Sequence, residues 1–471
     1  MDILSMLMTI AAVAIIVYML AVGGVYLILF FLAVPRVFRE RKLDRNEPIE
    51  DMLESSDTYP VSVLVPAYNE ELGVVSTVRS LLSLEYPEFE VIVINDGSKD
   101  ATSEKMIDAF QMKQVSMAVR QHFETAEMQA VYRSNVFPHV VLVEKANGGK
   151  ADALNAGINV SRYPYFAAID GDSILERDAL MKTMKPIIDS NGLVTCTGGT
   201  VRIANGSTIR DSVVEQIRLP KQAPAIMQII EYFRAFLIGR LGLSRLNVLL
   251  IISGAFGVFE KERVVRAGGY ETKTVGEDME LIVRLHAMLK EEKSKQRIEY
   301  IQDPVCWTEA PSDMRSLKSQ RIRWQKGLFQ TLWRHKYMML NPKYKGVGLF
   351  SMPYFLLVEL LSSVFELIGY AVIILALLFG LVDPTITMTM IIVTILYGSL
   401  LSSLAVLLEE WTYHKYPDTL SVLKLYLWSL TETFWYRPFM VWCRVMGIIA
   451  FFKGGHSWGH MQRRGISSPE Q

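Results

Sequence analysis

Two carboxylates flank a glycine in this 471-residue chain, directly after a short apolar run. The run is Phe166–Ile169 and the acidic turn is Asp170-Gly171-Asp172. Short apolar runs predict buried strands, and open α/β sheets bind ligands beyond the carboxyl ends of their strands. One carboxylate on each side of a tight turn suits Mg2+ or Mn2+ that is also bridged to phosphate oxygens. Asp and Gly are ordinary turn residues, so this pattern alone leaves a solvated turn as the alternative.

A second acidic pair, Glu277-Asp278, stands at the start of an amphipathic segment. A positioned carboxylate can act as a general base, although acids at a helix start also serve as partners of the helix dipole. Farther along, Gln320, Arg323 and Trp324 are spaced i, i+3 and i+4, so they share one face of a predicted helix. A guanidinium on that face could pair bidentately with a diphosphate. A surface arginine and a packing tryptophan are the alternative.

Four short apolar runs end in polar loops in the first half of the chain. They are Val61–Val65, Val91–Ile94, Val140–Val143 and Phe166–Ile169, with helical patterns at about 72–84 and 151–159 between them. Strands that alternate with helices imply a parallel sheet, whose carboxyl ends meet at one edge. One ligand pocket at that edge explains why all four loops are rich in Asp, Asn, Glu, Lys or Gly.

Other segments complete the predicted α/β domain. Thr102–Arg133 has a polar, helical pattern and is predicted to be a surface helix. Val194–Ile203 continues the sheet, and Ile298–Pro304 and Val305–Glu309 are predicted as its last strands. Charges interrupt the apolar region 223–252, which favours an amphipathic helix on the cytoplasmic face of a membrane, with a buried helix as the alternative.

The composition indicates a membrane protein. Hydrophobic residues make up 51% of the chain, and no charged residue occurs from Ile3 to Pro35, which is enough for one long, tilted span. Basic residues follow from Arg36 to Arg45, and positive charge marks the cytoplasmic side. We therefore expect the N-terminus outside and the following domain in the cytoplasm. The 49 Lys and Arg balance 49 Asp and Glu, so no nucleic-acid partner is expected.

Apolar character returns after residue 345. Leu357–Leu381 and Pro384–Leu408 are predicted spans, whereas charges interrupt Leu420–Phe452, which forms either two polar spans or an interfacial pair. Glu359 and Glu366 are seven residues apart, so they share a face and could line a channel; an interfacial position of Glu359 is the alternative.

We expect three parts in all. They are an N-terminal span with its basic flank at 1–45, a cytoplasmic α/β domain with interfacial helices at 46–345, and transmembrane or interfacial helices with a cytoplasmic tail at 346–471.

The three cysteines lie far apart in the sequence. Cys196, Cys306 and Cys443 have neither the spacing of a zinc site nor that of a disulfide framework. Their pattern is typical of a protein whose hydrophilic part lies in a reducing compartment.

The motifs together resemble a known family. The stretches PAYNEE, INDGSKDAT, NGGKADALNAGI and IDGDS occur in the order typical of family-2 glycosyltransferases with the GT-A fold. The segments SGAFGVFEKE, VGEDMELIVRL and QRIRW extend the resemblance over about residues 60–330, and the last is similar to the Gln-x-x-Arg-Trp signature of membrane-embedded synthases of cellulose, hyaluronan and poly-N-acetylglucosamine. One departure is Asn95 before Asp96, where many relatives have two aspartates, which leaves the role of position 95 open.

This resemblance implies a Rossmann-like GT-A domain joined to a helical transmembrane bundle, and a role for each loop. On the donor side, it implies that Asp96 accepts a hydrogen bond from uracil and that Tyr68 packs on the base. It places Glu70 and Lys150 near the base and ribose. Asp172 is the first expected ligand of Mg2+ or Mn2+, and Asp170 contacts the metal or the ribose.

On the acceptor side, the resemblance implies that Asp278 is the base and that Glu277 shapes the site. Arg323 would face the diphosphate, with Gln320 and Trp324 on the same helix face. Ser253 and Gly254 belong to a loop where small residues let a sugar approach the backbone.

The expected enzyme is an inverting, processive glycosyltransferase of the inner or plasma membrane. It would move sugar from a UDP-sugar to a growing β-linked polysaccharide and pass the polymer outward, with an accessory export subunit as a candidate partner. A non-processive enzyme that glycosylates a membrane lipid is the first alternative, and an inactive transport or scaffold subunit is the second. A nucleotide dehydrogenase is excluded, because no G-x-G-x-x-G follows the first strand.

Overall fold

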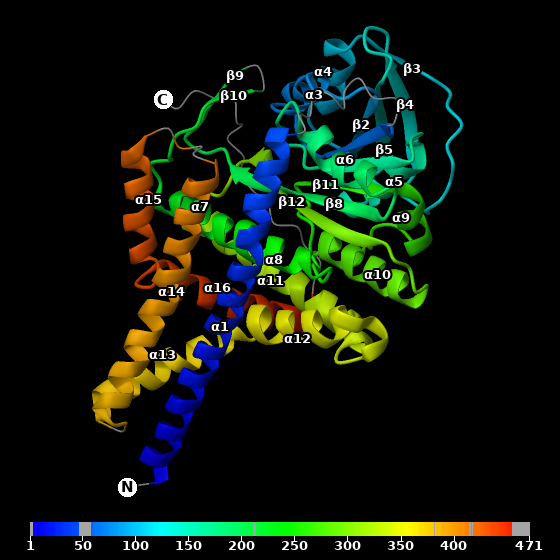
Figure 1. Ribbon diagram of the computed structural model, residues 1–471. Coiled ribbons are helices and arrows are strands. Elements are labelled where there is room, and N and C mark those ends of the chain that lie inside the picture. The colour runs from blue at the N-terminus through cyan, green and yellow to red at the C-terminus, as the bar shows by residue number, and fades with distance from the viewer. Residues whose placement is uncertain are drawn as a thin grey trace.

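An α/β domain packs beside long helices that project away from it (Figure 1). The computed structural model describes residues 3–46, 58–210, 213–380, 382–413, 416 and 418–454. Most of the expected linker before Val61, and the end of the expected tail from residue 455 onward, lie outside the described residues. The N-terminus lies at the end of the projecting helices that is farthest from the α/β domain (Figure 1).

A ten-stranded mixed sheet forms the centre of the α/β domain. Its order is β3-β4-β5-β2-β1-β6-β11-β8-β12-β7. The strands are β1 (Val61–Ala67), β2 (Phe89–Asp96), β3 (Met112–Gln114), β4 (Met128–Ser134), β5 (Val140–Lys145), β6 (Tyr165–Ile169), β7 (Ile174–Leu175), β8 (Val194–Ile203), β11 (Phe256–Glu260) and β12 (Arg297–Thr308). A separate hairpin pairs β9 (Thr208–Arg210) with β10 (Val213–Gln216).

The predicted parallel core is confirmed. Strand β1 lies between β2 and β6, β2 also pairs with β5, and all three pairings are parallel. The central strands are buried on both faces, as their continuous Val and Ile runs predict. The carboxyl ends of β1, β2, β5 and β6 therefore meet at one edge, which carries the four polar loops. Strand β11 pairs antiparallel with β6 and β8, which places its preceding loop at the same edge.

Helices cover the sheet and form the projecting part. Those of the α/β domain are α3 (Val74–Leu82), α4 (Thr102–Ala109), α5 (Lys150–Val160), α6 (Ala179–Asp189), α7 (Ala223–Phe233), α8 (Leu241–Arg245), α9 (Lys261–Ala267), α10 (Glu277–Glu291) and α11 (Met314–Arg334). The others are α1 (Ile3–Asn46), α12 (Met352–Tyr354), α13 (Ser362–Phe379), α14 (Pro384–Tyr413), α15 (Thr419–Thr431) and α16 (Tyr436–Phe452). The π-helical turns are η1 (Arg234–Arg240), η4 (Val347–Ser351) and η5 (Phe355–Leu360).

The prediction of one surface helix over Thr102–Arg133 is wrong. Only α4 is helical there, and it is followed by the edge strands β3 and β4. Both strands are largely half-buried or exposed, so their composition is polar and hides the strand period. The intervening loop is held by side chains of α5, because Asn159 accepts from the Phe123 N–H and Asp152 from the Ala126 N–H.

Two other segments differ in detail from the predictions. The strands predicted at Ile298–Pro304 and Val305–Glu309 are one strand, β12, with register shifts around Pro304. The region 223–252 begins with the contiguous helical stretches α7, η1 and α8, from Ala223 to Arg245. Its charged side chains have protein partners, since Arg234 donates to Glu432 and Arg245 to the carbonyl of Leu32. These contacts favour the buried helix that was the alternative, while contact of this region with headgroups stays a prediction.

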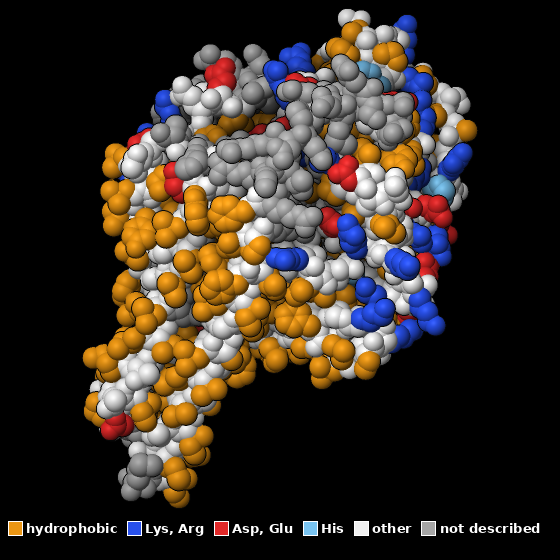
Figure 2. Space-filling model, viewed as in Figure 1, with side chains coloured by type: hydrophobic (Ala, Val, Ile, Leu, Met, Phe, Trp, Pro, Cys, Tyr) orange, Lys and Arg blue, Asp and Glu red, His pale blue; other side chains and the backbone are white. Residues whose placement is uncertain are grey.

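Three helical stretches are long and apolar enough to cross a membrane. Within the described residues they are Ile3–Pro35, Val347–Phe379 and Pro384–Tyr413. Hydrophobic side chains cover the projecting helices on the face in Figure 2, while charged side chains gather on the α/β domain. Helices α15 and α16 are shorter, with 13 and 17 residues, and α16 packs against α11. These lengths favour the interfacial pair over two further spans.

The three cysteines lie on different elements. Cys196, Cys306 and Cys443 are all free and buried. Cys196 lies on β8 and Cys306 on β12, while Cys443 lies on α16.

Candidate functional site

One cavity of about 1720 Å3 extends from the carboxyl edge of the sheet to the membrane helices. Every site residue predicted from the sequence lines it. These residues are Tyr68, Glu70, Asp96, Lys150, Asp170, Asp172, Ser253, Gly254, Glu277, Asp278, Gln320, Arg323 and Trp324. The sheet topology brings them together, because the loops after β1, β2, β5 and β6 share an edge that α10 and α11 face.

Hydrogen bonds join the loops that follow β1 and β2. The Asn69 N–H donates to Ser98 Oγ at 2.9 Å, and the Lys99 N–H donates back to Asn69 Oδ1 at 2.8 Å. Tyr68 precedes Asn69 in the loop after β1. It is 41% exposed and lines the cavity. Asn95 is buried and supports the second loop, since its amide donates to Ser103 and its oxygen accepts from the Ser98 N–H. Position 95 thus organises the loop and does not line the cavity.

Asp96 is a buried carboxylate with several protein donors. It accepts from Lys145 Nζ at 2.5 Å, from the Gly148 N–H at 2.9 Å and from the Gly149 N–H at 2.7 Å. Both of its oxygens therefore fix the Gly-Gly turn before α5. Lys145, which also pairs with Asp152 at 2.6 Å, was not predicted from the sequence. The available signal was a lysine at the end of a buried strand, because Lys145 ends β5 in register with Asp96 at the end of β2.

Lys150 lies between the two acidic motifs. Its Nζ is 2.5 Å from Asp170 Oδ1 and 3.8 Å from Glu277 Oε1, and it donates to the Gly254 carbonyl at 3.2 Å. Burial by itself would lower the pKa of Lys150, but the carboxylates of Asp170 and Glu277 outweigh burial and raise that pKa above its usual value. The ammonium therefore stays charged and ties the Asp-Gly-Asp turn to the start of α10.

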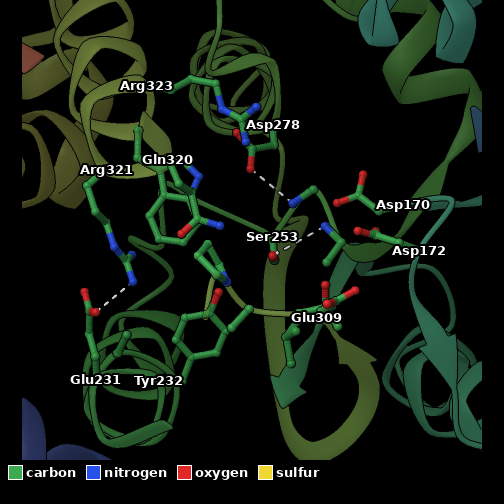
Figure 3. Close-up of a pocket in the computed structure, with 18 of the residues that line it drawn as sticks. Asp170, Asp172, Glu231, Tyr232, Ser253, Asp278, Glu309, Gln320, Arg321 and Arg323 are labelled. Carbon is green, nitrogen blue, oxygen red and sulfur yellow. Dashed lines mark hydrogen bonds and ion pairs between the residues drawn. The ribbon is translucent and has the colours of Figure 1, made fainter. Parts of the chain in front are cut away.

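Asp170 and Asp172 point into the same part of the cavity from the turn after β6 (Figure 3). Backbone packs against this turn, because a side chain on Gly171 would lie 3.2 Å from the Pro66 carbonyl. Glu309, which follows the end of β12, also lines the cavity and is drawn in the same view (Figure 3). Within the described ranges, no group of three or more His, Cys, Asp or Glu has the arrangement of a metal site. The turn after β6 itself offers two carboxylates, Asp170 and Asp172.

The loop before β11 contacts Asp278 directly. The Gly254 N–H donates to Asp278 Oδ2 at 3.1 Å, and Asp278 Oδ1 accepts from the Met279 N–H at 2.8 Å (Figure 3). A Cβ on Gly254 would lie 3.0 Å from Lys150 Nζ and 3.4 Å from Asp278 Oδ2. Glycine at this position therefore leaves room for both charged groups, whereas a larger residue would need them to shift.

Glu277 is almost fully enclosed, with its side chain 9% exposed. Burial raises the pKa of Glu277 to about 7, with a further upward contribution from Asp278 and an opposing one from Lys150. A carboxyl in this environment is close to the balance between its neutral and charged forms near neutral pH. Perturbed carboxyls of this kind are frequent in active sites.

Helix α11 presents the Gln-x-x-Arg-Trp residues to the cavity. Its start is fixed by Asp313, which accepts from the backbone N–H groups of Arg315 and Ser316. Arg323 points toward Asp278 (Figure 3). Trp324 is 43% exposed and lines the cavity. Arg321, whose guanidinium stacks on the Trp324 ring at 4.2 Å, was not predicted from the sequence.

Ion pairs line the part of the cavity nearest the membrane helices. Arg321 donates to Glu231 at 2.8 Å, and Tyr436 donates to the same oxygen at 2.8 Å. Arg437 binds Glu366 through two hydrogen bonds of 2.8 Å each. These partners lie up to 205 residues apart, so sequence spacing could not pair them.

Both membrane-side glutamates predicted to share a face lie in the cavity wall, where they have protein partners. Glu366 pairs with Arg437, and Glu359 accepts from Tyr26 of α1 at 2.8 Å and from Tyr354 at 3.0 Å. A third ion pair, after Arg321–Glu231 and Arg437–Glu366, joins η1 to the residue that follows α15. In it, Arg234 donates to Glu432 at 3.0 Å.

Comparison with known proteins identifies the family and the fold. Residues 62–239 match the sequence model of "Glycosyl transferase family 2", and residues 165–406 match that of "Glycosyl transferase family group 2". The mannosyltransferase PcManGT from Pyrobaculum calidifontis, solved with GDP-Man and Mn2+, superposes with a TM-score of 0.51 at 17% identity. The superposition covers 90% of this chain and 99% of that one, and it shows a shared fold.

Two curated relatives are named poly-beta-1,6-N-acetyl-D-glucosamine synthase. The protein of Staphylococcus epidermidis RP62A is 29% identical over 324 residues, which are 68% of this chain and 65% of that one. The protein of Staphylococcus aureus COL is 30% identical over 285 residues, which are 60% and 58%. The chain thus spans less than two thirds of either relative. Because the group 2 model covers more than half of its 471 residues, the chain belongs to the family-2 glycosyltransferases.

Proposed function

We propose that this glycosyltransferase extends a β-linked polysaccharide from a UDP-sugar at the cytoplasmic face of a membrane. One observation carries the proposal: a single cavity joins the nucleotide loops of the sheet, the Asp278 carboxylate and the membrane helices. An enzyme with a small soluble acceptor has no need for a site that is continuous with apolar helices. Poly-β-1,6-N-acetylglucosamine is the first candidate polymer, because two relatives carry that name.

The donor nucleotide would lie on the loops after β1, β2 and β5. The exposed face of Tyr68 offers a platform for the base, and Asp96 holds the Gly-Gly turn beside it. Any hydrogen bond from the base to Asp96 would be added to those from Lys145, Gly148 and Gly149. Glu70 lines the same part of the cavity. Lys150 is proposed as a diphosphate contact instead of a base contact, because its ammonium lies against Asp170.

The residues present fit a divalent cation. Asp170 and Asp172 provide two hard oxygen ligands, and Mg2+ or Mn2+ commonly completes its coordination with phosphate oxygens and water. Once bound, the cation would neutralise charge that develops on the leaving diphosphate. Arg323 would add a guanidinium to the same diphosphate.

Asp278 is proposed as the base. As the acceptor oxygen forms its bond to the anomeric carbon, the proton of that hydroxyl passes to Asp278. The bond from the anomeric carbon to the diphosphate breaks, and UDP leaves with the electron pair. Displacement from the side opposite the leaving group inverts the anomeric centre, so an α-linked donor gives a β-linked product. The Gly254 N–H, which donates to Asp278 Oδ2, supports this orientation.

The acceptor polymer would approach along α11 and leave between the membrane helices. The exposed face of Trp324 offers an apolar platform for a sugar ring. Beyond it, the cavity wall carries the pairs Arg321–Glu231 and Arg437–Glu366, which present hydrogen-bonding groups to hydroxyls without a large net charge. We further propose an inner or plasma membrane location, a cytoplasmic α/β domain, an outside N-terminus and an accessory export subunit.

The test is to offer membranes that contain the full chain a panel of labelled UDP-sugars, starting with UDP-N-acetylglucosamine. We expect metal-dependent release of UDP and a polymer that a linkage-specific hydrolase degrades. A single sugar found on a lipid extract would favour the non-processive alternative. The absence of turnover with every donor would contradict the proposal and favour a transport or scaffold role.

A further inference from the structure

The two helices that carry the candidate base and the Gln-x-x-Arg-Trp residues touch through backbone atoms. A Cβ on Gly327 of α11 would lie 2.9 Å from Gly276 Cα and 3.0 Å from Gly276 N. A Cβ on Gly276 would lie 3.0 Å from Gly327 Cα. Because these neighbours are backbone atoms, no side-chain rotation could relieve the overlap. Any larger residue at either position must move one helix away from the other.

A left-handed backbone explains neither glycine. Gly276 has a negative φ of −124°, outside the region that favours glycine. Gly327 lies in the interior of α11, where alanine is more favourable than glycine. The close approach of the two segments is therefore the reason for both residues.

Side-chain hydrogen bonds also join α11 to the segment that contains Gly276. Gln330 Oε1 accepts from the Val275 N–H and from Thr274 Oγ1, both at 3.1 Å. Thr274 Oγ1 in turn accepts from the Gly276 N–H at 3.2 Å. Farther along α10 and α11, the buried side chains of Glu280 and His335 form a hydrogen bond of 3.1 Å.

The contact stands next to the proposed chemistry without taking part in it. Asp278 follows Gly276 by two residues, and Arg323 and Trp324 precede Gly327 by about one helical turn. Gly327 and Gln330 do not line the described cavity, whereas Gly276, Asp278, Arg323 and Trp324 do. We propose that the Gly276–Gly327 contact and its Gln330 hydrogen bonds set the position of Asp278 relative to Arg323 and Trp324. This inference rests on the proposed function, and it makes Gly327 and Gln330 positioning residues.

The first test is Gly327→Ala in the full chain, purified in detergent. We expect kcat for UDP release to fall by about 10²-fold, because displacement of reacting groups by roughly 1 Å can cost that much. The Kd for UDP should rise by a much smaller factor than kcat falls, because the loops proposed to bind the base and ribose belong to other elements and only the proposed contact of Arg323 with the diphosphate lies on α11. The matched control is Gly24→Ala, in the interior of α1, where an added Cβ would have no neighbouring protein atom within 4 Å, so wild-type kcat should be retained.

The second test replaces Gln330 by side chains of similar size, so it removes hydrogen bonds without a steric overlap. Gln330→Leu removes the oxygen that accepts both hydrogen bonds, whereas Gln330→Glu keeps a carboxylate oxygen in its place. We expect the leucine variant to lose kcat at an unchanged KM for the donor, and the glutamate variant to recover most of it. A purely structural role would not give this split between kcat and KM together with rescue.

Each outcome distinguishes this inference from the proposed function. Equal kcat in Gly327→Ala and Gly24→Ala would overturn the positioning role while leaving the proposed function intact. Parallel loss of UDP binding and kcat in Gly327→Ala and Gln330→Leu would also overturn it, because that result indicates a folding defect. Wild-type protein that turns over no UDP-sugar would overturn the proposed function and this inference with it.

Discussion

A single ammonium is shared by two acidic motifs that lie 107 positions apart in the chain, at Asp170 and Glu277. Lys150 keeps these carboxylates close to each other without a cation or a diphosphate between them. Donor binding would change this arrangement, because a cation on Asp170 repels the ammonium. The released ammonium would then pair with the phosphates or more closely with Glu277. The charge balance of the site thus depends on the donor.

Asp172→Asn tests the metal ligand. An amide is a poor ligand for a hard cation, so we expect turnover to be lost and UDP to bind more weakly in Mg2+ or Mn2+. Asp189→Asn is the control, because Asp189 is an exposed acid on α6 that pairs with Lys185. Turnover and metal-dependent UDP binding are measured in both variants to test whether Asp172 binds the cation. Undiminished turnover in Asp172→Asn would remove this residue from the site.

Asp278→Asn tests the base. The amide keeps an oxygen that can accept the Gly254 N–H, so the loop should stay in place. The proton acceptor is lost, so we expect turnover to fall by about 10²- to 10⁴-fold while the Kd for UDP is preserved. Single-turnover kinetics and UDP titration provide the two measurements. A collapse of UDP affinity would assign Asp278 to donor binding instead.

Glu277 predicts a pH dependence of stability. Its pKa in the folded chain is raised from 4.5 to about 7. The folded state therefore favours the neutral carboxyl, and this contribution to stability is complete below about pH 4.5 and lost as the pH rises through about 7. We expect Tm to fall more steeply between pH 5 and 8 in the wild type than in Glu277→Gln. Parallel Tm curves in detergent would show that burial of Glu277 does not carry this linkage.

At the scale of elements, α11 is proposed to join the donor and acceptor sites, and Trp324 is the residue that tests this role. Trp324→Ala should abolish or shorten the polymer while hydrolysis of the donor to UDP persists, because the sugar platform is lost but Arg323 remains. Trp324→Phe should retain part of the activity. UDP release and product length are measured on the same membranes. Normal polymer from the alanine variant would rule out an acceptor role.

A folding defect is the competing explanation for the same variant. Equal loss of UDP release and polymer would indicate it. A folding defect is the less favoured explanation, because Trp324 is 43% exposed and contacts the guanidinium of Arg321.

The sequence predicted the elements whose pattern is set by burial on both sides. The apolar runs of β1, β2, β5 and β6 are continuous, so their strands and polar loops could be read directly. The edge strands β3 and β4 could not, because polar side chains face solvent and the loop between them depends on Asn159 and Asp152. Local pattern carries no information about such distant partners.

The same limit applies to the site. Motif residues next to strand ends were all predictable, since topology alone brings them to one edge. Arg321 and Glu231 were not, because their pairing depends on how α7 packs against α11. Asn95 was open in the sequence and is explained only by its bonds to Ser98 and Ser103.

At the scale of the whole molecule, the orientation in the membrane can be tested. The basic flank of α1 predicts that the N-terminus lies outside and the α/β domain inside. We expect a tag at the N-terminus to be digested by protease added to intact spheroplasts. A tag inserted between the exposed residues Gln121 and His122 should resist digestion until the membrane is permeabilised. The reverse pattern would contradict the predicted orientation.

Because all three cysteines are buried, their thiols should react slowly with electrophiles. Burial raises the pKa of Cys443 to about 11 and those of Cys196 and Cys306 further. Almost no thiolate therefore exists at neutral pH, and the thiolate is the form that reacts. The native protein should resist sulfenic acid formation and maleimide labelling alike. A new cysteine on the cavity wall would be the one reactive thiol in the molecule. The rate at which maleimide labels it would therefore show whether water reaches that part of the cavity.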